Sequence, residues 1–135
     1  MIIEGRNTGP DWDIDLEFGQ RSEDSLAEIL SMGKVEVKTE RDIWVKTGKI
    51  AIEVQRRDWR DDWVPSGLTA TKAEYWAHIL TKGEEIKFVI LMPVAVLRRR
   101  VTHLLKNNWA TQVIGGENDN AALVLVPLGQ IIGNK

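Results

Sequence analysis

The sequence predicts a single α/β domain over residues 1–135, close to the α+β class, in which helices flank a mixed central sheet. Two stretches of alternating apolar and polar residues predict half-buried strands, and a nearly all-apolar run predicts a third strand. Apolar residues at helical spacing predict three helices, which gives the order α-β-β-α-β-α-β when a last short strand is included. The expected elements are 22–31, 35–40, 49–55, 71–81, 86–91, 94–107 and 122–126.

The composition limits the classes of protein that fit this chain. It has 18 basic and 20 acidic side chains, so a nucleic-acid site would have to be a local basic patch. It has no cysteine, which excludes disulfides, thiolate zinc sites and cysteine nucleophiles. The amino-terminal stretch is polar and the longest apolar run is about eight residues, so we expect no signal peptide and no membrane span.

The first predicted helix, residues 22–31, carries an acidic residue on its apolar face. Ser22 is a favourable N-cap and Gly33 is suited to the position after the helix end. Apolar residues follow Glu23 at offsets of three, four and seven, so Glu23 shares their stripe. Its carboxylate is either paired or metal-bound, or it stabilises the first turn and bends toward water.

The two alternating stretches predict a hairpin that turns near Gly48. Pairing residue 40 with residue 49 would place Glu36 opposite Glu53, with Lys38 beside them. Like charges directly opposite each other are destabilising. This arrangement is therefore either a cost in stability or a site that holds a cation.

The loop over residues 56–70 interleaves basic and aromatic side chains. Arg56, Arg57 and Arg60 alternate with Trp59 and Trp63, a combination that suits contact with phosphates and bases. Three aspartates in the same stretch nearly cancel the charge, so a salt-bridged exposed loop explains the pattern equally well.

A capping box at residues 71–74 predicts a helix that extends to about residue 81. His78 falls outside the apolar stripe of this helix, which predicts a surface role for it. The apolar run at 86–91 predicts a strand buried on both faces, parallel to the strand at 49–55 through a right-handed crossover.

The last predicted helix, residues 94–107, combines an apolar stripe with a basic cluster. The stripe consists of Val94, Leu97, Val101 and Leu104. The cluster of Arg98, Arg99 and Arg100 is either a phosphate-binding patch or an ordinary solvated face.

Two stretches carry a resemblance to a known family. GQRSEDSLAEIL resembles the first helix, with its acidic residue, of the PD-(D/E)XK nuclease superfamily, and RDIWVKTGKIAIEVQ resembles that superfamily's Asp-turn-strand unit. The likeness covers roughly residues 19–91 and puts Asp42, Glu53 and Gln55 in the motif positions. The segments EVKTE, TGK, SGL and TKAEYW are also similar to small phage-encoded proteins of this type.

The chain departs from the superfamily motif at two positions. No proline precedes Asp42, and Gln55 stands where the catalytic lysine is usual. Lys38 could supply the amine, or EVK at 36–38 could itself be the Glu-x-Lys motif with Glu53 as an added ligand. The carboxylates left open as partners of Glu53 are Glu36, Glu40 and Asp42.

The resemblance implies a restriction-endonuclease-like core and Mg²⁺- or Mn²⁺-dependent hydrolysis of DNA. It implies a structure-selective or end-processing enzyme, a possible homodimer, and the cytoplasm of a bacterial or phage-infected cell. The implied catalytic residues are Glu23, Lys38, Asp42, Glu53 and Gln55. The candidate metal ligands are Glu23, Glu36, Glu40, Asp42 and Glu53. The candidate DNA contacts are Arg56, Arg57, Arg60, Lys72, Arg98, Arg99 and Arg100.

Two other hypotheses fit the same residues. In the first, the missing motif lysine means lost catalysis, and the chain is a nuclease-fold module that binds DNA or a protein partner. In the second, the chain is a small α+β interaction protein whose strand charges form ordinary ion pairs. The position of the Lys38 amine relative to Glu53 discriminates between catalysis and binding alone.

Overall fold

A computed structural model describes residues 10–133, with side chains from Leu16 onward, and divides into two compact units, Met1–Lys34 and Val35–Lys135. The described part of the first unit is the helix α1 (Pro10–Ser31) and the residues that follow it. This confirms the helix predicted over 22–31, although it begins twelve residues earlier. Gly33 adopts φ 68°, the left-handed conformation expected just after a helix end.

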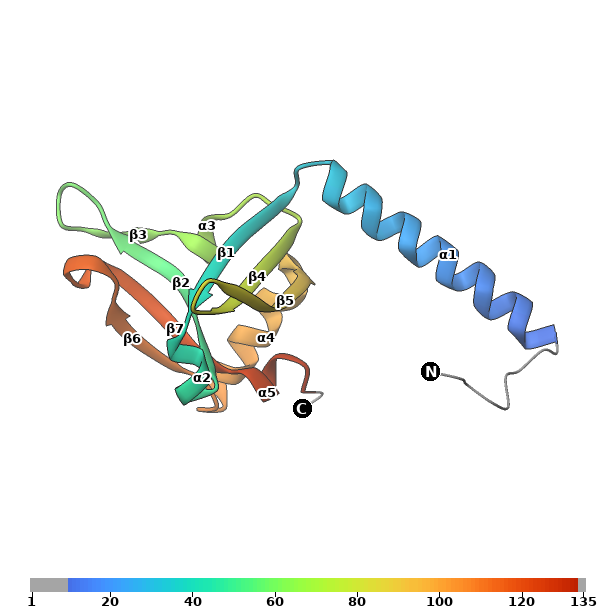
Figure 1. Ribbon diagram of the computed structural model, residues 1–135. Helices are drawn as coiled ribbons and strands as arrows, with labels where there is room; N and C mark the ends of the chain where they lie inside the picture. The colour runs from blue at the N-terminus through green and yellow to red at the C-terminus, as the bar shows by residue number, and fades with distance from the viewer. Residues whose placement is uncertain (1–9, 134–135) are drawn as a thin grey trace. The chain divides into compact units, whose positions relative to one another are not determined.

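The second unit contains two sheets (Figure 1). One has the strand order β1-β4-β5 and the other has the order β3-β2-β7-β6, so two sheets replace the single central sheet that the sequence predicts. With helices and strands mixed along the chain, the α/β class is confirmed. The elements are β1 (Val35–Arg41), α2 (Ile43–Thr47), β2 (Lys49–Arg57), β3 (Trp63–Pro65), α3 (Gly67–Ala70), β4 (Tyr75–Lys82), β5 (Glu85–Pro93), α4 (Val94–Lys106), β6 (Thr111–Gly115), the 3₁₀ turn η1 (Glu117–Asp119), β7 (Ala121–Pro127) and α5 (Leu128–Ile131).

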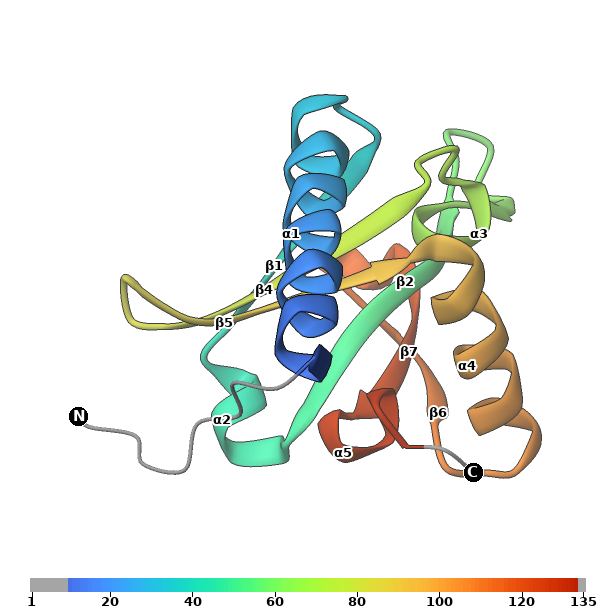
Figure 2. The same cartoon turned by 90° about the vertical axis from the view of Figure 1, so that its right-hand side faces the viewer.

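The core of the second unit is formed where α4 packs on the strands (Figure 2). The predicted stripe of α4 is confirmed, because its four residues are the buried ones of that helix. They join Ile50 and Ile52 of β2 and Val124 and Val126 of β7 in one apolar cluster. Burial of such side chains stabilises a fold by about 1.5–3 kcal/mol each, so this cluster fixes the positions of β2 and β7.

The predicted hairpin between the first two strands is wrong. β1 pairs in parallel with β4, whereas β2 pairs antiparallel with β3 and β7. The short helix α2 separates β1 from β2 and carries the chain from one sheet to the other. The turn signal at Gly48 marks the end of α2, where Gly48 adopts φ 65° and donates its N–H to the carbonyl of Trp44 at 2.8 Å.

The helix predicted over 71–81 is also wrong, because most of that stretch is β4. Thr71 Oγ1 accepts the N–H of Ala73 at 3.2 Å, a local turn that resembles a capping box in sequence. β4 then turns at Gly83, with φ 61°, into β5. The surface role predicted for His78 is wrong as well, since strand alternation turns His78 inward and leaves it 2% exposed.

The strand predicted over 86–91 exists as β5, but it is not buried on both faces and does not pair with β2. It pairs antiparallel with β4 at the edge of its sheet. Within the second unit, Ile86, Phe88 and Val89 remain more than half exposed. The strand predicted near 122–126 is confirmed as β7. Within residues 10–133, no helix is both long enough and apolar enough to cross a membrane.

Candidate functional site

The polar face of β1 points into the second unit. In the parallel pairing of β1 with β4, Lys38 is the partner of His78 and Glu40 is the partner of Leu80. Paired residues share a face of the sheet, and these two β4 residues are buried at 2% and 0% exposure. Val37, on the opposite face of β1, is 52% exposed. The side chains of Lys38 and Glu40 therefore lie beside the core and are half-buried.

A cavity of about 260 Å³ lies where the two sheets face each other. Its walls come from β1 and β4 of one sheet and from β2 and β7 of the other. It brings together three residues that the sequence proposes for one site, although not through the expected hairpin. The lining residues are Lys38, Thr39, Glu40, Ala51, Glu53, Trp76, His78 and Leu123.

Glu40 is the best-anchored carboxylate of the cavity. Its Oε1 atom accepts the backbone N–H of Ala51 at 2.8 Å and lies 3.0 Å from Nε2 of His78. His78 Nδ1 lies 3.1 Å from the indole nitrogen of Trp76. Because an indole only donates, Nδ1 accepts, and Nε2 carries the proton that His78 donates to Glu40. This chain of hydrogen bonds fixes Oε1 and leaves Oε2 available to a ligand.

Lys38 and Glu53 have no such anchors. The Lys38 Nζ atom lies 5.9 Å from the centre of the Trp76 ring, a cation–π contact that keeps the amine beside the cavity. Among residues 16–133, neither the Lys38 nor the Glu53 side chain forms a hydrogen bond or an ion pair. Both are half-buried, so a bound polar group would be their natural partner.

The backbone at Glu53 is held in an irregular but well-defined position. The pairing of β2 with β7 shifts register between Glu53 and Gln55, which is a β-bulge. Gly67, at the start of α3 with φ 49°, lies so close that an added Cβ would stand 2.1 Å from the Glu53 carbonyl oxygen. Bulges are common beside active sites because they redirect side chains.

Four of the predicted catalytic and metal-binding residues lie outside the cavity lining. Asp42 follows β1 with φ 44°, and its Oδ1 accepts the N–H of Gly83 at 2.7 Å, so it ties β1 to the β4–β5 turn. Glu36 and Gln55 are half-buried on β1 and β2 without lining the cavity. Glu23 lies exposed on α1 of the first unit.

The carboxylate oxygens of the cavity are the type of ligand that a hard divalent cation prefers. Within the described residues, no group of three or more Asp, Glu or His side chains is arranged to hold a metal. The carboxylates that line the cavity are those of Glu40 and Glu53. Mg²⁺ is usually bound by one or two carboxylates together with waters and substrate phosphates. The two carboxylates match this requirement in number.

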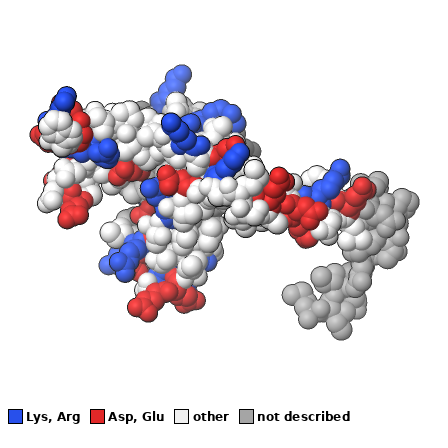
Figure 3. Space-filling view, turned by 90° about the horizontal axis from the view of Figure 1, so that it is seen from above, with Lys and Arg blue, Asp and Glu red and all other residues white. Residues whose placement is uncertain are grey.

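The predicted DNA contacts on α4 are partly used in the fold. Arg98 donates from Nε to the Leu68 carbonyl at 2.9 Å and from a terminal nitrogen to the Thr71 carbonyl at 2.8 Å. Arg100 donates from Nε to the Gln130 carbonyl at 2.6 Å. Lys72 and Arg99 are exposed. Basic and acidic side chains are intermixed over the face in Figure 3, so no broad basic surface is visible there.

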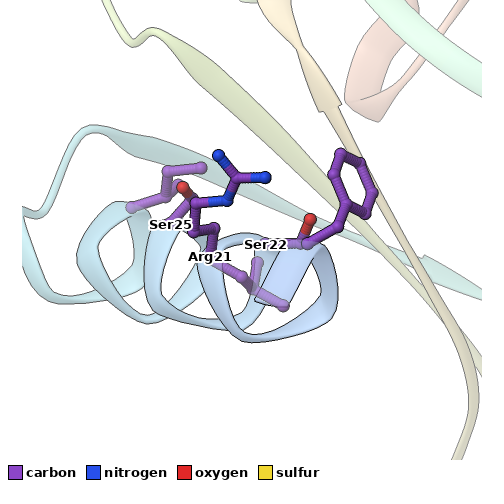
Figure 4. A pocket seen from close by; sticks show the side chains of 6 residues that line it. Arg21, Ser22 and Ser25 are labelled. Carbon is purple, nitrogen blue, oxygen red and sulfur yellow. The ribbon is translucent and has the colours of Figure 1, made fainter. Parts of the chain in front are cut away.

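Other hollows are found among the described residues, and the first, about 510 Å³, is lined by residues of α3, α4, β2, β6 and β7. A second, of about 590 Å³, is mainly apolar and lies under α2, and it shares Glu40, Ala51 and Leu123 with the cavity. This second hollow and the cavity therefore adjoin, and a substrate could extend from the polar one into the apolar one. The third, about 490 Å³, lies along α1 and is lined only by residues of that helix, including Arg21, Ser22 and Ser25 (Figure 4).

Sequence reasoning missed His78 and Trp76, which together orient Glu40. Alternation in the segment YWAHIL, with Trp76, His78 and Leu80 on one face, was the available signal. The capping box at 71–74 obscured it by predicting a helix. Comparison with protein-family models, with curated proteins and with solved structures finds no match for this chain.

Proposed function

We propose that this protein is a divalent-metal-dependent phosphodiester hydrolase acting on DNA, with its centre in the cavity between the two sheets. The observation that carries the proposal is the convergence of Lys38, Glu40 and Glu53 on one cavity of about 260 Å³. Two carboxylates and an amine are the groups that such hydrolysis needs, and they come here from strands of different sheets.

Glu40 and Glu53 would hold Mg²⁺ or Mn²⁺, because both cations prefer hard oxygen ligands. A cation bound there would polarise the phosphate and help ionise the attacking water. The role as a metal ligand that the PD-(D/E)XK resemblance implies for Glu23, an exposed residue of α1, stays a prediction and is not part of this proposal.

Lys38 takes the place of the motif lysine in this proposal. Its amine rests on the Trp76 ring at the cavity, whereas Gln55 lies outside the lining. An ammonium group in a half-buried site can orient a water or stabilise the charge that develops on a phosphate. The hydrogen bonds from His78 and Ala51 keep Glu40 in one orientation while this happens.

The test is a panel of plasmid, linear, single-stranded and branched DNA incubated with Mg²⁺ or Mn²⁺. We expect metal-dependent cleavage that Glu53→Gln abolishes, because the amide removes the charge and keeps the shape. Glu117→Gln is the matched control, since Glu117 is exposed and outside the cavity, and it should cleave like the wild type. Equal cleavage by the Glu53→Gln protein would refute the assignment.

The same panel also distinguishes the rival function. If the wild type binds DNA but cleaves none of the substrates with either metal, the chain is a binding module and not an enzyme. Homodimer formation is a further expectation from the resemblance, and sedimentation of the full chain at several concentrations tests it.

A further inference from the structure

The hairpin between β2 and β3 extends away from the rest of its sheet (Figure 1). The Trp59 side chain is 86% exposed. The Arg60 guanidinium lies 4.5 Å from the centre of the Trp59 ring, and Arg57 lies 4.7 Å from that of Trp63. We call residues 56–63 the hairpin tip.

Hydrogen bonds fix the backbone of the hairpin tip on both sides of Trp59. Asp58 Oδ1 accepts the N–H of Arg60 at 2.8 Å and the N–H of Asp62 at 3.0 Å. The backbones of Asp58 and Asp62 are joined by a hydrogen bond of 2.9 Å. A rigid aromatic ring binds with a smaller loss of conformational entropy than one on a mobile loop.

Two of the three arginines of the hairpin tip are not paired with its aspartates. Asp58 is engaged by backbone N–H groups, and Asp61 pairs with Arg57 at 3.1 Å. Arg56 and Arg60 are exposed. The tip therefore offers a ring and two guanidinium groups beside the exposed carboxylate of Asp62, and its three arginines and three aspartates cancel in formal charge.

We propose that the hairpin tip binds unpaired nucleotides, with Trp59 stacking on a base and Arg56 and Arg60 contacting the flanking phosphates. Base–aromatic stacking needs the face of a base, and a duplex covers both faces of its bases. Guanidinium groups match the oxygens of a phosphate, and arginine beside an aromatic ring is suited to nucleic acid. The proposed partner is therefore single-stranded nucleic acid, including the frayed end of a duplex.

The test measures fluorescence anisotropy of a labelled oligothymidine of about 12 nucleotides, a length within the range of known single-strand sites. EDTA is present throughout, so that binding is measured without the metal that the proposed hydrolysis requires. Loss of one stacked base is expected to weaken binding of the Trp59→Ala protein about tenfold. Trp59→Phe retains a ring and should keep most of the affinity.

Trp109→Ala is the matched control, because Trp109 is 42% exposed on a different surface and should bind like the wild type. Arg60→Gln should reduce the dependence of log affinity on log salt by about 0.7, the value for one phosphate contact to a single strand. All of these substitutions replace exposed side chains, and circular dichroism of each variant checks that it is folded. Equal affinities of the Trp59→Ala and Trp109→Ala proteins, no binding by the wild type, or equal binding of a blunt duplex would overturn the proposal.

Discussion

Replacing Gly67 by alanine tests whether the close contact between α3 and β2 fixes Glu53. Gly67 has φ 49°, which costs a non-glycine residue about 1–2 kcal/mol. The added Cβ would also stand 2.1 Å from the Glu53 carbonyl oxygen, so one backbone must move, and overpacking of this kind costs about 1–3 kcal/mol. We expect a total loss of about 3 kcal/mol in the free energy of unfolding, measured by urea denaturation.

Gly83→Ala is the matched control for this substitution. Gly83 has φ 61°, but an added Cβ would meet no atom within 4 Å, so only the backbone conformation contributes a cost, about 1–2 kcal/mol. At a temperature where both variants are folded, Gly67→Ala should also lose metal-dependent cleavage while Gly83→Ala retains it. If the two variants lose the same free energy of unfolding, the contact with Glu53 does not constrain the backbone and the reasoning is refuted.

Two further predictions concern the hydrogen bonds near the cavity. Trp76→Phe removes the hydrogen-bond donor to His78 Nδ1, so a buried acceptor loses its partner. The free energy of unfolding, measured by urea denaturation, should fall by about 1–2 kcal/mol. No change in that free energy would argue against the assigned tautomer of His78. Asp42→Asn keeps an oxygen for the N–H of Gly83 and lies outside the cavity, so DNA cleavage should persist, and its loss would restore Asp42 as a metal ligand.

Periodicity identified α4 correctly because nothing competes with its pattern. Val94, Leu97, Val101 and Leu104 recur at helical spacing and all four are buried. In the segment from Thr71 onward, by contrast, a capping-box pattern and a strand alternation coexist in one sequence. Sheet pairing with β1 and β5 decides in favour of the strand, and such long-range contacts cannot be read from local propensity.

The alternation of β1 predicted which residues share a face but not which face is buried. Val37 belongs to the apolar set and is 52% exposed, whereas Lys38 and Glu40 belong to the polar set and face the interior. An isolated strand contains no information about the side on which the second sheet lies. The cavity brings Lys38 and Glu53 together with Glu40, one of the three carboxylates that the sequence left open, whereas Glu36, which the wrongly predicted hairpin placed opposite Glu53, does not line it.

Charged side chains that face the interior of a protein cost free energy, and the residues of the cavity differ in how far hydrogen bonds offset that cost. Buried polar groups are normally compensated by hydrogen bonds. Glu40 is compensated within the protein by His78 and Ala51, but within residues 16–133 the side chains of Lys38 and Glu53 form no hydrogen bond or ion pair. Lys38 and Glu53 are therefore not in the close contact that would favour catalysis over binding alone, although they line the same cavity. Their half-buried side chains are ones that a cation and a phosphate would satisfy, which is why our proposal places the chemistry at this cavity and not at the more exposed Asp42.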